Sequence, residues 1–324
     1  MKTFFLFCFV LLLMCNVYAQ DSFNPEVAET LIQSGEIQKA ASYLRDHAST
    51  NRNNPEWHYM MGHLEFEKNE YRDAIDSFGK AMSLDAESLD YMLWYGNATC
   101  SAAAEAGTLR QFRLARRCKA SYERVIEKFP DNIEAREHLI RFHLQAPGSV
   151  GGSITDAHTL ADEIYERDVF RGYMAKFRLA ADTNDDSAMI SVLEQASATY
   201  PDSVQFRYNL GLLYIQSGSY EKAYSEMKVS SELMPGDWRW KYQIGRIAAL
   251  GNIRLEEGLK AFETLLENEP EEINPTFHSS AYARKAQIYL HSGEIQKAKE
   301  ALLKAKEIEP ENTLIDQVMQ QLPD

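Results

Sequence analysis

Residues 204–237 read VQFRYNLGLLYIQSGSYEKAYSEMKVSSELMPGD, and this stretch decides the fold. Apolar side chains recur every three or four residues on both sides of Gly218. Leu210 and Tyr214 do so before it, and Tyr220, Tyr224 and Met227 do so after it. This spacing is typical of helices with one buried face. Glycine readily takes the positive φ that ends a helix. The stretch therefore predicts two amphipathic helices joined by a turn at Gly218.

The same arrangement recurs along the chain. The heptapeptide SGEIQKA occurs at 34–40 and again at 292–298. Pro201 and Pro235, which end successive segments, are 34 residues apart. Self-similarity at such a period indicates a repeat architecture, in which each helix pair must stack on its neighbours to bury its apolar face. We expect about eight units, which begin near Phe23, Asn53, Ser88, Ile133, Arg171, Val204, Asp237 and Ser279.

Each unit also carries a shared pattern. A small residue such as Gly211 stands where two helices touch, an aromatic residue such as Tyr214 follows within one turn, Ala223 lies in the second helix, and Pro235 ends the unit. In these features the chain resembles the tetratricopeptide-repeat family. The resemblance implies an all-α solenoid, a right-handed superhelix over residues 20–310, with 311–324 as a C-terminal capping helix. No stretch alternates with period two, so no sheet is expected.

Two places depart from the period. Ala86 to Pro130 is about ten residues too long, and we expect longer helices or a wider turn near 103–113. Residues 146–153, APGSVGGS, predict an irregular surface loop. Its glycines could bring N–H groups to a phosphate, but no Lys-Ser/Thr pair follows and no strand precedes. We expect a helix connector instead, with Ser153 or Thr155 capping the next helix.

The N-terminus has the pattern of a secretory signal. Lys2 precedes an apolar run from Phe4 to Met14, and Ala19 fits the residue before a cleavage point. The run is shorter than the roughly 20 residues that span a bilayer. We therefore expect residues 1–19 to be removed and the protein to be exported, either to a periplasm or out of the cell. The alternatives are a membrane anchor and a lipid-modified Cys15, which the bulky Met14 disfavours.

The amino-acid composition excludes some classes of binding partner. The chain has 34 basic and 48 acidic side chains and a net charge of −14. Removal of Lys2 with the signal leaves a charge of about −15. So acidic a chain repels nucleic acid and anionic membrane surfaces. Cys8 and Cys15 leave with the signal, so that Cys100 and Cys118 could form one disulfide in an oxidising compartment.

The resemblance also implies that the first helix of each unit lines a concave binding groove. On this register the groove carries an unusual share of arginine and tyrosine, which are enriched at binding hot spots. Arginine predicts a protein or peptide partner with an anionic segment. The same residues could instead be ordinary surface residues. The Lys/Asn carboxylate clamp of some family members is not reproduced. The expected groove residues are Tyr59, His63, Asn97, Arg141, Arg178, Tyr208, Tyr242 and Arg246.

No pattern indicates catalysis, a metal or a cofactor. The pairs His58/His63 and His138/His143 are spaced five apart, so their rings diverge on a helix, and we expect surface or groove histidines. The acids at 182–186 lack the Gly and Glu of a calcium loop and are expected to cap a helix. The sequence therefore predicts an exported scaffold for protein–protein interaction, with no enzymatic activity. The alternatives are a peptide- or glycan-binding module of a cell-envelope machine and an enzyme that uses the loop at Gly148–Ser153.

Overall fold

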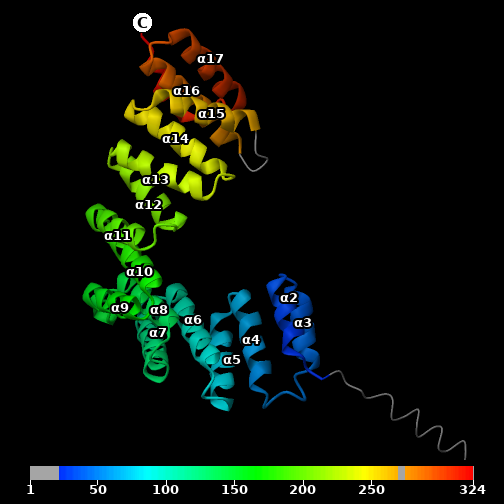
Figure 1. The fold of residues 1–324 in the computed structure, drawn as a ribbon. Helices are drawn as coiled ribbons and strands as arrows, with labels where there is room; N and C mark the ends of the chain where they lie inside the picture. The colour runs from blue at the N-terminus through cyan, green and yellow to red at the C-terminus, as the bar shows by residue number, and fades with distance from the viewer. Residues whose placement is uncertain (1–21, 269–273, 324) are drawn as a thin grey trace, which may run out of the picture. The chain divides into compact units, whose positions relative to one another are not determined.

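The computed structural model describes residues 22–268 and 274–323 (Figure 1). Within these ranges the chain forms 17 α-helices, α2 to α18, one short 3₁₀ helix, η1, and no strand. The prediction of an all-α tetratricopeptide-type solenoid is confirmed. None of the helices in the described ranges is both long enough and apolar enough to cross a membrane. The expected signal peptide, residues 1–19, lies outside these ranges.

The helices pack as eight consecutive pairs. The first helices of the pairs are α2 (Pro25–Gln33), α4 (Pro55–Glu67), α6 (Leu89–Glu105), α8 (Ile133–Gln145), α10 (Val169–Asp182), α12 (Val204–Gln216), α14 (Trp238–Gly251) and α16 (Pro275–His291). The second helices are α3 (Ile37–Asp46), α5 (Tyr71–Leu84), α7 (Thr108–Lys128), α9 (Ile154–Arg167), α11 (Asp186–Thr199), α13 (Tyr220–Leu233), α15 (Leu255–Asn268) and α17 (Ile295–Ile308). A last helix, α18 (Thr313–Met319), packs on α16 and α17, where a capping helix is expected.

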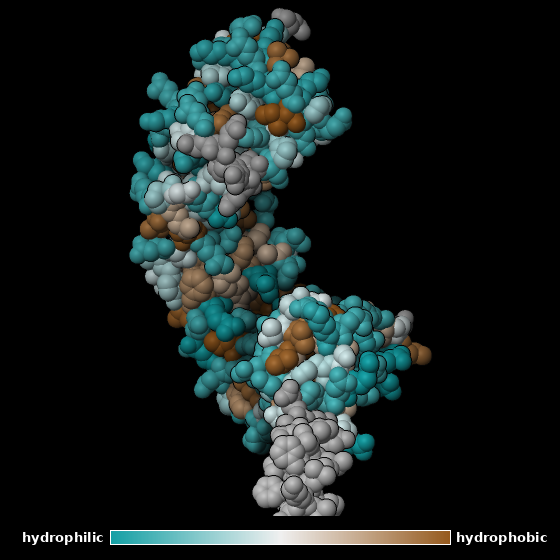
Figure 2. Space-filling view, turned by 90° about the vertical axis from the view of Figure 1, so that its right-hand side faces the viewer, coloured by the Kyte–Doolittle hydropathy of each residue, from teal (hydrophilic) through white to brown (hydrophobic). Residues whose placement is uncertain are grey.

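The chain divides into two compact units, one ending at Asp168 and the other beginning at Val169. We call them unit 1, with α2 to α9, and unit 2, with α10 to α18. The repeats predict one array over residues 20–310, and the division falls between its fourth and fifth helix pairs. Each unit has its own apolar core. Figure 2 shows hydrophilic side chains over most of the visible face, with apolar ones scattered between them.

Capping side chains start most of the helices. Asn54 precedes α4, and its side-chain oxygen accepts a hydrogen bond from the Glu56 backbone N–H at 3.0 Å. This satisfies one of the N–H groups that a helix start leaves without a partner. Ser153 caps α9 in the same way, through the Asp156 N–H at 3.1 Å, as expected. Asp185 caps α11 through the Ala188 N–H, so the acidic cluster at 182–186 does start a helix.

Glycines of the first helices face large side chains of the second helices. A Cβ at Gly245 would lie 2.4 Å from the Phe262 ring, and one at Gly62 would lie 2.6 Å from the Phe78 ring. Gly96 and Gly211 have the same relation to Tyr122 and Met227. No real Cβ fits at such distances without a shift of its neighbours, so only glycine allows the two helices this close. The expected role of the small residues is confirmed.

The extra residues of the third pair lengthen its helices. α6 has 17 residues and α7 has 21, against 13 and 14 in α4 and α5. The expected irregular loop after α8 is partly regular, because Gly148–Val150 forms η1 and Gly151 takes a φ of 101°. Val150 is buried, which anchors this connection to the protein. Long helices and an anchored loop make the third and fourth pairs different from the rest.

Candidate partner-binding site

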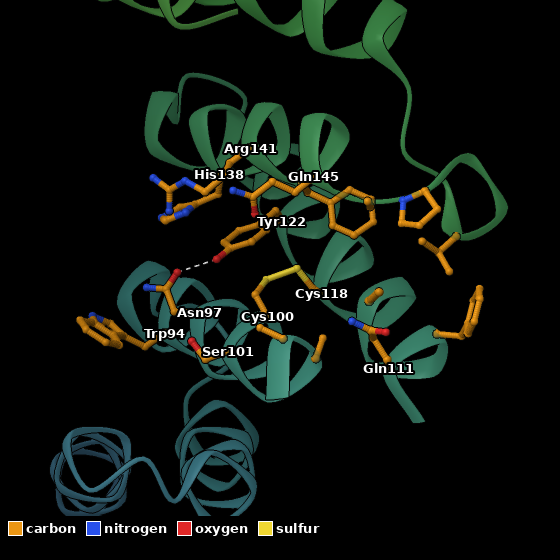
Figure 3. Close-up of a pocket in the computed structure, with 18 of the residues that line it drawn as sticks. Trp94, Asn97, Cys100, Ser101, Gln111, Cys118, Tyr122, His138, Arg141 and Gln145 are labelled. Atoms are coloured by element: carbon orange, nitrogen blue, oxygen red, sulfur yellow. Dashed lines mark hydrogen bonds between the residues drawn. A yellow bond between two sulfur atoms is a disulfide. The ribbon is translucent and has the colours of Figure 1, made fainter. Parts of the chain in front are cut away.

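A cavity of about 700 Å³ opens between α6, α7 and α8 in unit 1 (Figure 3). This volume lies within the range of ligand pockets, about 300–1,000 Å³. We call it the α6–α8 pocket. Its lining is apolar and aromatic with a few polar groups. The polar and aromatic residues of the lining are Phe66, Trp94, Asn97, Ser101, Gln111, Phe112, Tyr122, His138, Arg141, Phe142 and Gln145.

Helical periodicity brings these residues together. On α6, Trp94, Asn97 and Ser101 are spaced by three and four residues, and all three line the pocket. On α8, His138, Arg141 and Gln145 have the same spacing. The expected groove residues Asn97 and Arg141 therefore lie in one pocket, on the helices from which the register placed them.

Tyr122 of α7 joins the two first helices. Its hydroxyl donates a hydrogen bond to Asn97 Oδ1 at 2.5 Å. Its ring stacks on the His138 ring, with centroids 4.7 Å apart and an 8° angle between the planes. Burial raises the pKa of Tyr122, and Arg141 only partly opposes this. The phenol therefore stays neutral and keeps donating to Asn97.

The charge of the pocket comes from Arg141. Burial lowers the pKa of His138, and Arg141 lowers it further, against the opposing Glu134 carboxylate 3.6 Å away. His138 is therefore neutral near pH 7. Arg141 is exposed, and among the described residues no carboxylate lies within 4.0 Å of its guanidinium. The pocket thus combines an unneutralised cation with aromatic and apolar walls.

Cys100 and Cys118 lie in the middle of the pocket wall, joined by a disulfide (Figure 3). Their Cα atoms are 5.0 Å apart, within the range that a disulfide needs. The bond connects α6 to α7 at the level of Tyr122. It therefore fixes the spacing of the two helices whose side chains form the pocket.

An aromatic cluster continues from the pocket across α4 and α5. Trp94 lies 4.2 Å from His63 and 5.4 Å from Phe66, measured between ring centroids. Tyr59 contacts His63 at 4.4 Å and Phe78 at 5.7 Å. The expected groove residues Tyr59 and His63 are thus half-buried members of this cluster, not free rings.

In unit 2 the structure places a second arginine beside Arg246. Arg284 lies half-buried on α16, which packs against α14, and its Nη1 donates to Gln287 Oε1 at 2.7 Å. Arg246 Nη1 donates to Gln243 Oε1 at 3.4 Å. Burial and the charge of Arg246 both lower the pKa of Arg284. Within the described part of unit 2, neither guanidinium has a carboxylate within 4.0 Å. Like charges are therefore held together without neutralisation.

The other expected residues of unit 2 lie in varied surroundings. Tyr242 is largely buried, and its ring meets Phe277 at 5.3 Å and Phe262 at 6.1 Å. Tyr208 packs edge-on against Trp240 at 5.2 Å. Arg178 is exposed on α10. Among the first helices of the pairs, α12 comes between α10 with Arg178 and α14 with Arg246, and it carries Leu212 one residue after Gly211.

Sequence reasoning missed Trp94 and Arg284, whereas His138 was expected as a surface or groove histidine and does line the pocket. Trp94 and His138 stand three residues before the expected groove residues Asn97 and Arg141. Residues three apart share a helix face, so this offset was the signal that could have found them. The expectation for His143 was wrong: it is only 4% exposed, near Lys119 of α7 and the backbone of Gly151. In the described ranges, no three His, Cys, Asp or Glu side chains converge as metal ligands.

Comparison with known proteins points to one family. Family models described as tetratricopeptide repeat match residues 56–88, 279–312 and 174–227. The C-terminal part of a TPR repeat-containing protein from Cytophaga hutchinsonii is 14% identical, with 93% of this chain and 100% of that chain covered and a TM-score of 0.51. Yeast Tom70 is 12% identical, covers 94% of this chain and 65% of its own, and has a TM-score of 0.49.

YrrB, described as a TPR protein with an unusual peptide-binding site, is 15% identical over 86% of this chain and 97% of its own, with a TM-score of 0.32. No curated protein sequence matches the chain. At such low sequence identities the structural likeness concerns the fold alone, and the comparison with the Cytophaga protein supports that fold. The repeat matches, the eight helix pairs and this likeness agree: the chain is a tetratricopeptide-repeat protein.

Proposed function

We propose that this protein is an exported interaction scaffold that holds a segment of a partner protein in the α6–α8 pocket. Tetratricopeptide repeats are built to present side chains from successive first helices on one extended surface. The observation that carries the proposal is the pocket itself, where Arg141 stands without a carboxylate beside aromatic walls. Arginine and aromatic residues are the groups that dominate binding energy at protein interfaces.

The chemistry of the pocket suggests what the segment contains. The aromatic and apolar walls around Trp94 and Phe112 fit an aromatic or aliphatic side chain. The planar guanidinium of Arg141 fits a carboxylate next to it. In unit 2, the Arg246–Arg284 pair supports a second contact with an anionic part of the partner, and Arg178 adds an exposed cation on α10. We therefore propose a partner segment with acidic and apolar residues side by side.

A peptide library selected on the purified protein tests the pocket. Selected sequences are expected to pair an acidic residue with an aromatic or aliphatic one, and Arg141→Glu should remove this selection. Arg45→Glu is the matched control, because Arg45 is also exposed in unit 1 but lies on α3, away from the pocket. If Arg141→Glu and the wild type select the same sequences, the pocket is not the binding site.

Export is tested separately. The sequence pattern at 1–19 supports cleavage after Ala19. The mature protein isolated from its native cell should begin at Gln20 and be found outside the cytoplasm. A mature chain that still begins at Met1 would contradict export without bearing on the pocket.

A further inference from the structure

The helix α7 has a charge opposite to that of the whole chain. Its 21 residues include five arginines and two lysines but only two glutamates, whereas the chain has 34 basic and 48 acidic side chains. The long third pair therefore concentrates positive charge in unit 1. A local field of this kind steers oppositely charged partners even when the net charge of the protein is negative.

Four of the arginines share the solvent side of α7. Arg113, Arg116, Arg117 and Arg124 are all exposed, while Leu114, Cys118, Tyr122 and Val125 are buried on the opposite side of the same helix. At 1.5 Å per residue, the four arginines extend over about 16 Å. We call them the α7 arginine face. The α6–α8 pocket uses other α7 residues, so the two surfaces are distinct.

The arginine face is not neutralised by its surroundings. Among the residues that the structure describes, no carboxylate lies within 4.0 Å of these four guanidinium groups. On α7, Glu123 pairs with Lys119 at 3.6 Å, and the exposed Glu127, three residues after Arg124, forms no ion pair with it. Arg117 lies over the Tyr95 ring, 5.0 Å from its centroid, and Arg116 reaches only the Ser149 carbonyl at 3.5 Å. Four arginines that form no ion pair within the described part of the chain remain available to acids from outside.

An apolar hollow lies beside the same arginines. A cavity of about 200 Å³ is lined by Met82 of α5, by Met92 and Tyr95 of α6, and by Arg117, Ala120, Ser121 and Arg124 of α7. Methionine side chains adapt to different apolar shapes. The cavity has room for one side chain of moderate size, and it opens between two members of the arginine face.

We propose that the α7 arginine face binds an acidic segment of a partner protein, which pairs its carboxylates with the guanidinium groups and inserts one apolar side chain at Met82, Met92 and Tyr95. A carboxylate suits arginine because the planar fork can donate two parallel hydrogen bonds. A short segment fits the face better than nucleic acid or an anionic bilayer does, because these extended polyanions would also meet the acidic remainder of the chain. This surface is separate from the pocket of the proposed function.

Fluorescence anisotropy on the full-length protein tests the proposal with a labelled peptide that has acidic residues on both sides of one leucine. Substitution R113Q/R116Q/R124Q should weaken its binding about tenfold, because charge-assisted hydrogen bonds are lost. The matched control R45Q/R52Q/R72Q removes three exposed arginines elsewhere in unit 1 and should change the affinity less than about twofold, because distant surface charges are screened. Circular dichroism melts establish that both variants are folded.

Ala120→Phe tests the hollow, because the new ring would occupy it from the exposed side of α7. This variant should bind the leucine peptide no more tightly than the wild type binds the same peptide with alanine in place of leucine. The proposal fails if a peptide with amides in place of carboxylates binds equally well, or if both triple variants weaken binding equally. It also fails if an oligonucleotide or vesicles of phosphatidylglycerol bind to the face while the acidic peptide does not. Arg141→Glu should leave this binding intact, which separates the result from that of the pocket.

Discussion

The Tyr122 ring lies so close to Gly96 that a Cβ on residue 96 would come within 2.8 Å of the ring atom Cε1. The contact sets the position of the ring between α6 and α7. From there Tyr122 donates to Asn97 and stacks on His138, so the packing of one glycine determines the geometry of the α6–α8 pocket. Fold and site depend on the same pair of residues.

Gly96→Ala should therefore destabilise unit 1 and disturb the pocket together. The methyl group must displace a buried aromatic ring, and overpacking of this kind costs about 1–3 kcal/mol, more than the gain in helix propensity of about 1 kcal/mol. Urea unfolding followed by circular dichroism measures the loss. Gly236→Ala is the control, because a Cβ there would meet nothing within 4 Å. Equal stability of the two variants would contradict the role of this contact.

The helix pairs were predictable because their signals are local. The apolar spacing, the glycines of the first helices and the caps at Ser153 and Asp185 each involve residues close in sequence. The starts of the eight expected units fall within a few residues of the starts of the first helices. A repeat needs only neighbour contacts, so its period carries most of the fold.

The sites were less predictable, because they depend on the exact register of each helix and on local charge that the overall composition does not reveal. Arg246 was expected in the groove, but the sequence did not indicate that Arg284 of α16 would lie beside it. Longer helices near 103–113 were one of the two expected alternatives, yet the sequence did not show that α6 and α7 would line a pocket. The negative net charge of the chain did not reveal the positive charge of α7, because the net charge sums over all helices.

Reduction of the disulfide should loosen the pocket. Cys100 and Cys118 are 18 residues apart, and closing a loop of this length stabilises a protein by about 3 kcal/mol in the chain-entropy model. Thermal unfolding with and without reductant should show the loss in the wild type. The double variant Cys100→Ser/Cys118→Ser should not respond to reductant. Two titratable thiols in the protein isolated without reductant would show that the bond does not form.

We expect Arg284 to contribute to the binding of anionic peptides while it lowers the stability of unit 2. Its guanidinium is partly buried beside Arg246, and its Nε is buried with no hydrogen-bond partner. Replacement of such a charge by an apolar side chain of similar length is often neutral or stabilising, here by up to about 1 kcal/mol. Arg284→Met should thus unfold at the same or a higher temperature, yet lose affinity for anionic peptides that contact unit 2. A clear fall in melting temperature would show that the arginine is structural.

Two titratable groups of α4 should affect stability in opposite directions. Burial raises the pKa of Glu65 to about 7, although Ser77 donates a hydrogen bond to its Oε2 at 2.6 Å. Burial lowers the pKa of His63 to about 4. Between pH 4.5 and about 7, the folded state holds a proton on Glu65 that the unfolded state has lost. Between about pH 4 and 6.5, the folded state lacks a proton on His63 that the unfolded state binds. Stability therefore falls with rising pH through Glu65 and rises with it through His63.

Comparison of Glu65→Gln with the wild type isolates the first effect. Above the unfolded pKa of about 4.5, the wild type must either take up a proton on Glu65 or bury its charge when it folds. The free-energy cost of this grows with pH up to the folded pKa near 7 and is constant above it. The variant has no such cost, so its stability relative to the wild type should be greater at pH 8 than at pH 4, by about 1 kcal/mol after allowance for solvent screening of a partly exposed group. Urea titrations at pH 4, 6 and 8 measure the difference, with the pH values chosen to bracket the shift from 4.5 to about 7. Glu67→Gln, which removes an exposed carboxylate from the same helix, should show no such trend. If Glu65→Gln and the wild type keep a constant difference from pH 4 to pH 8, then the pKa of Glu65 is the same in the folded and unfolded protein, and burial does not raise it.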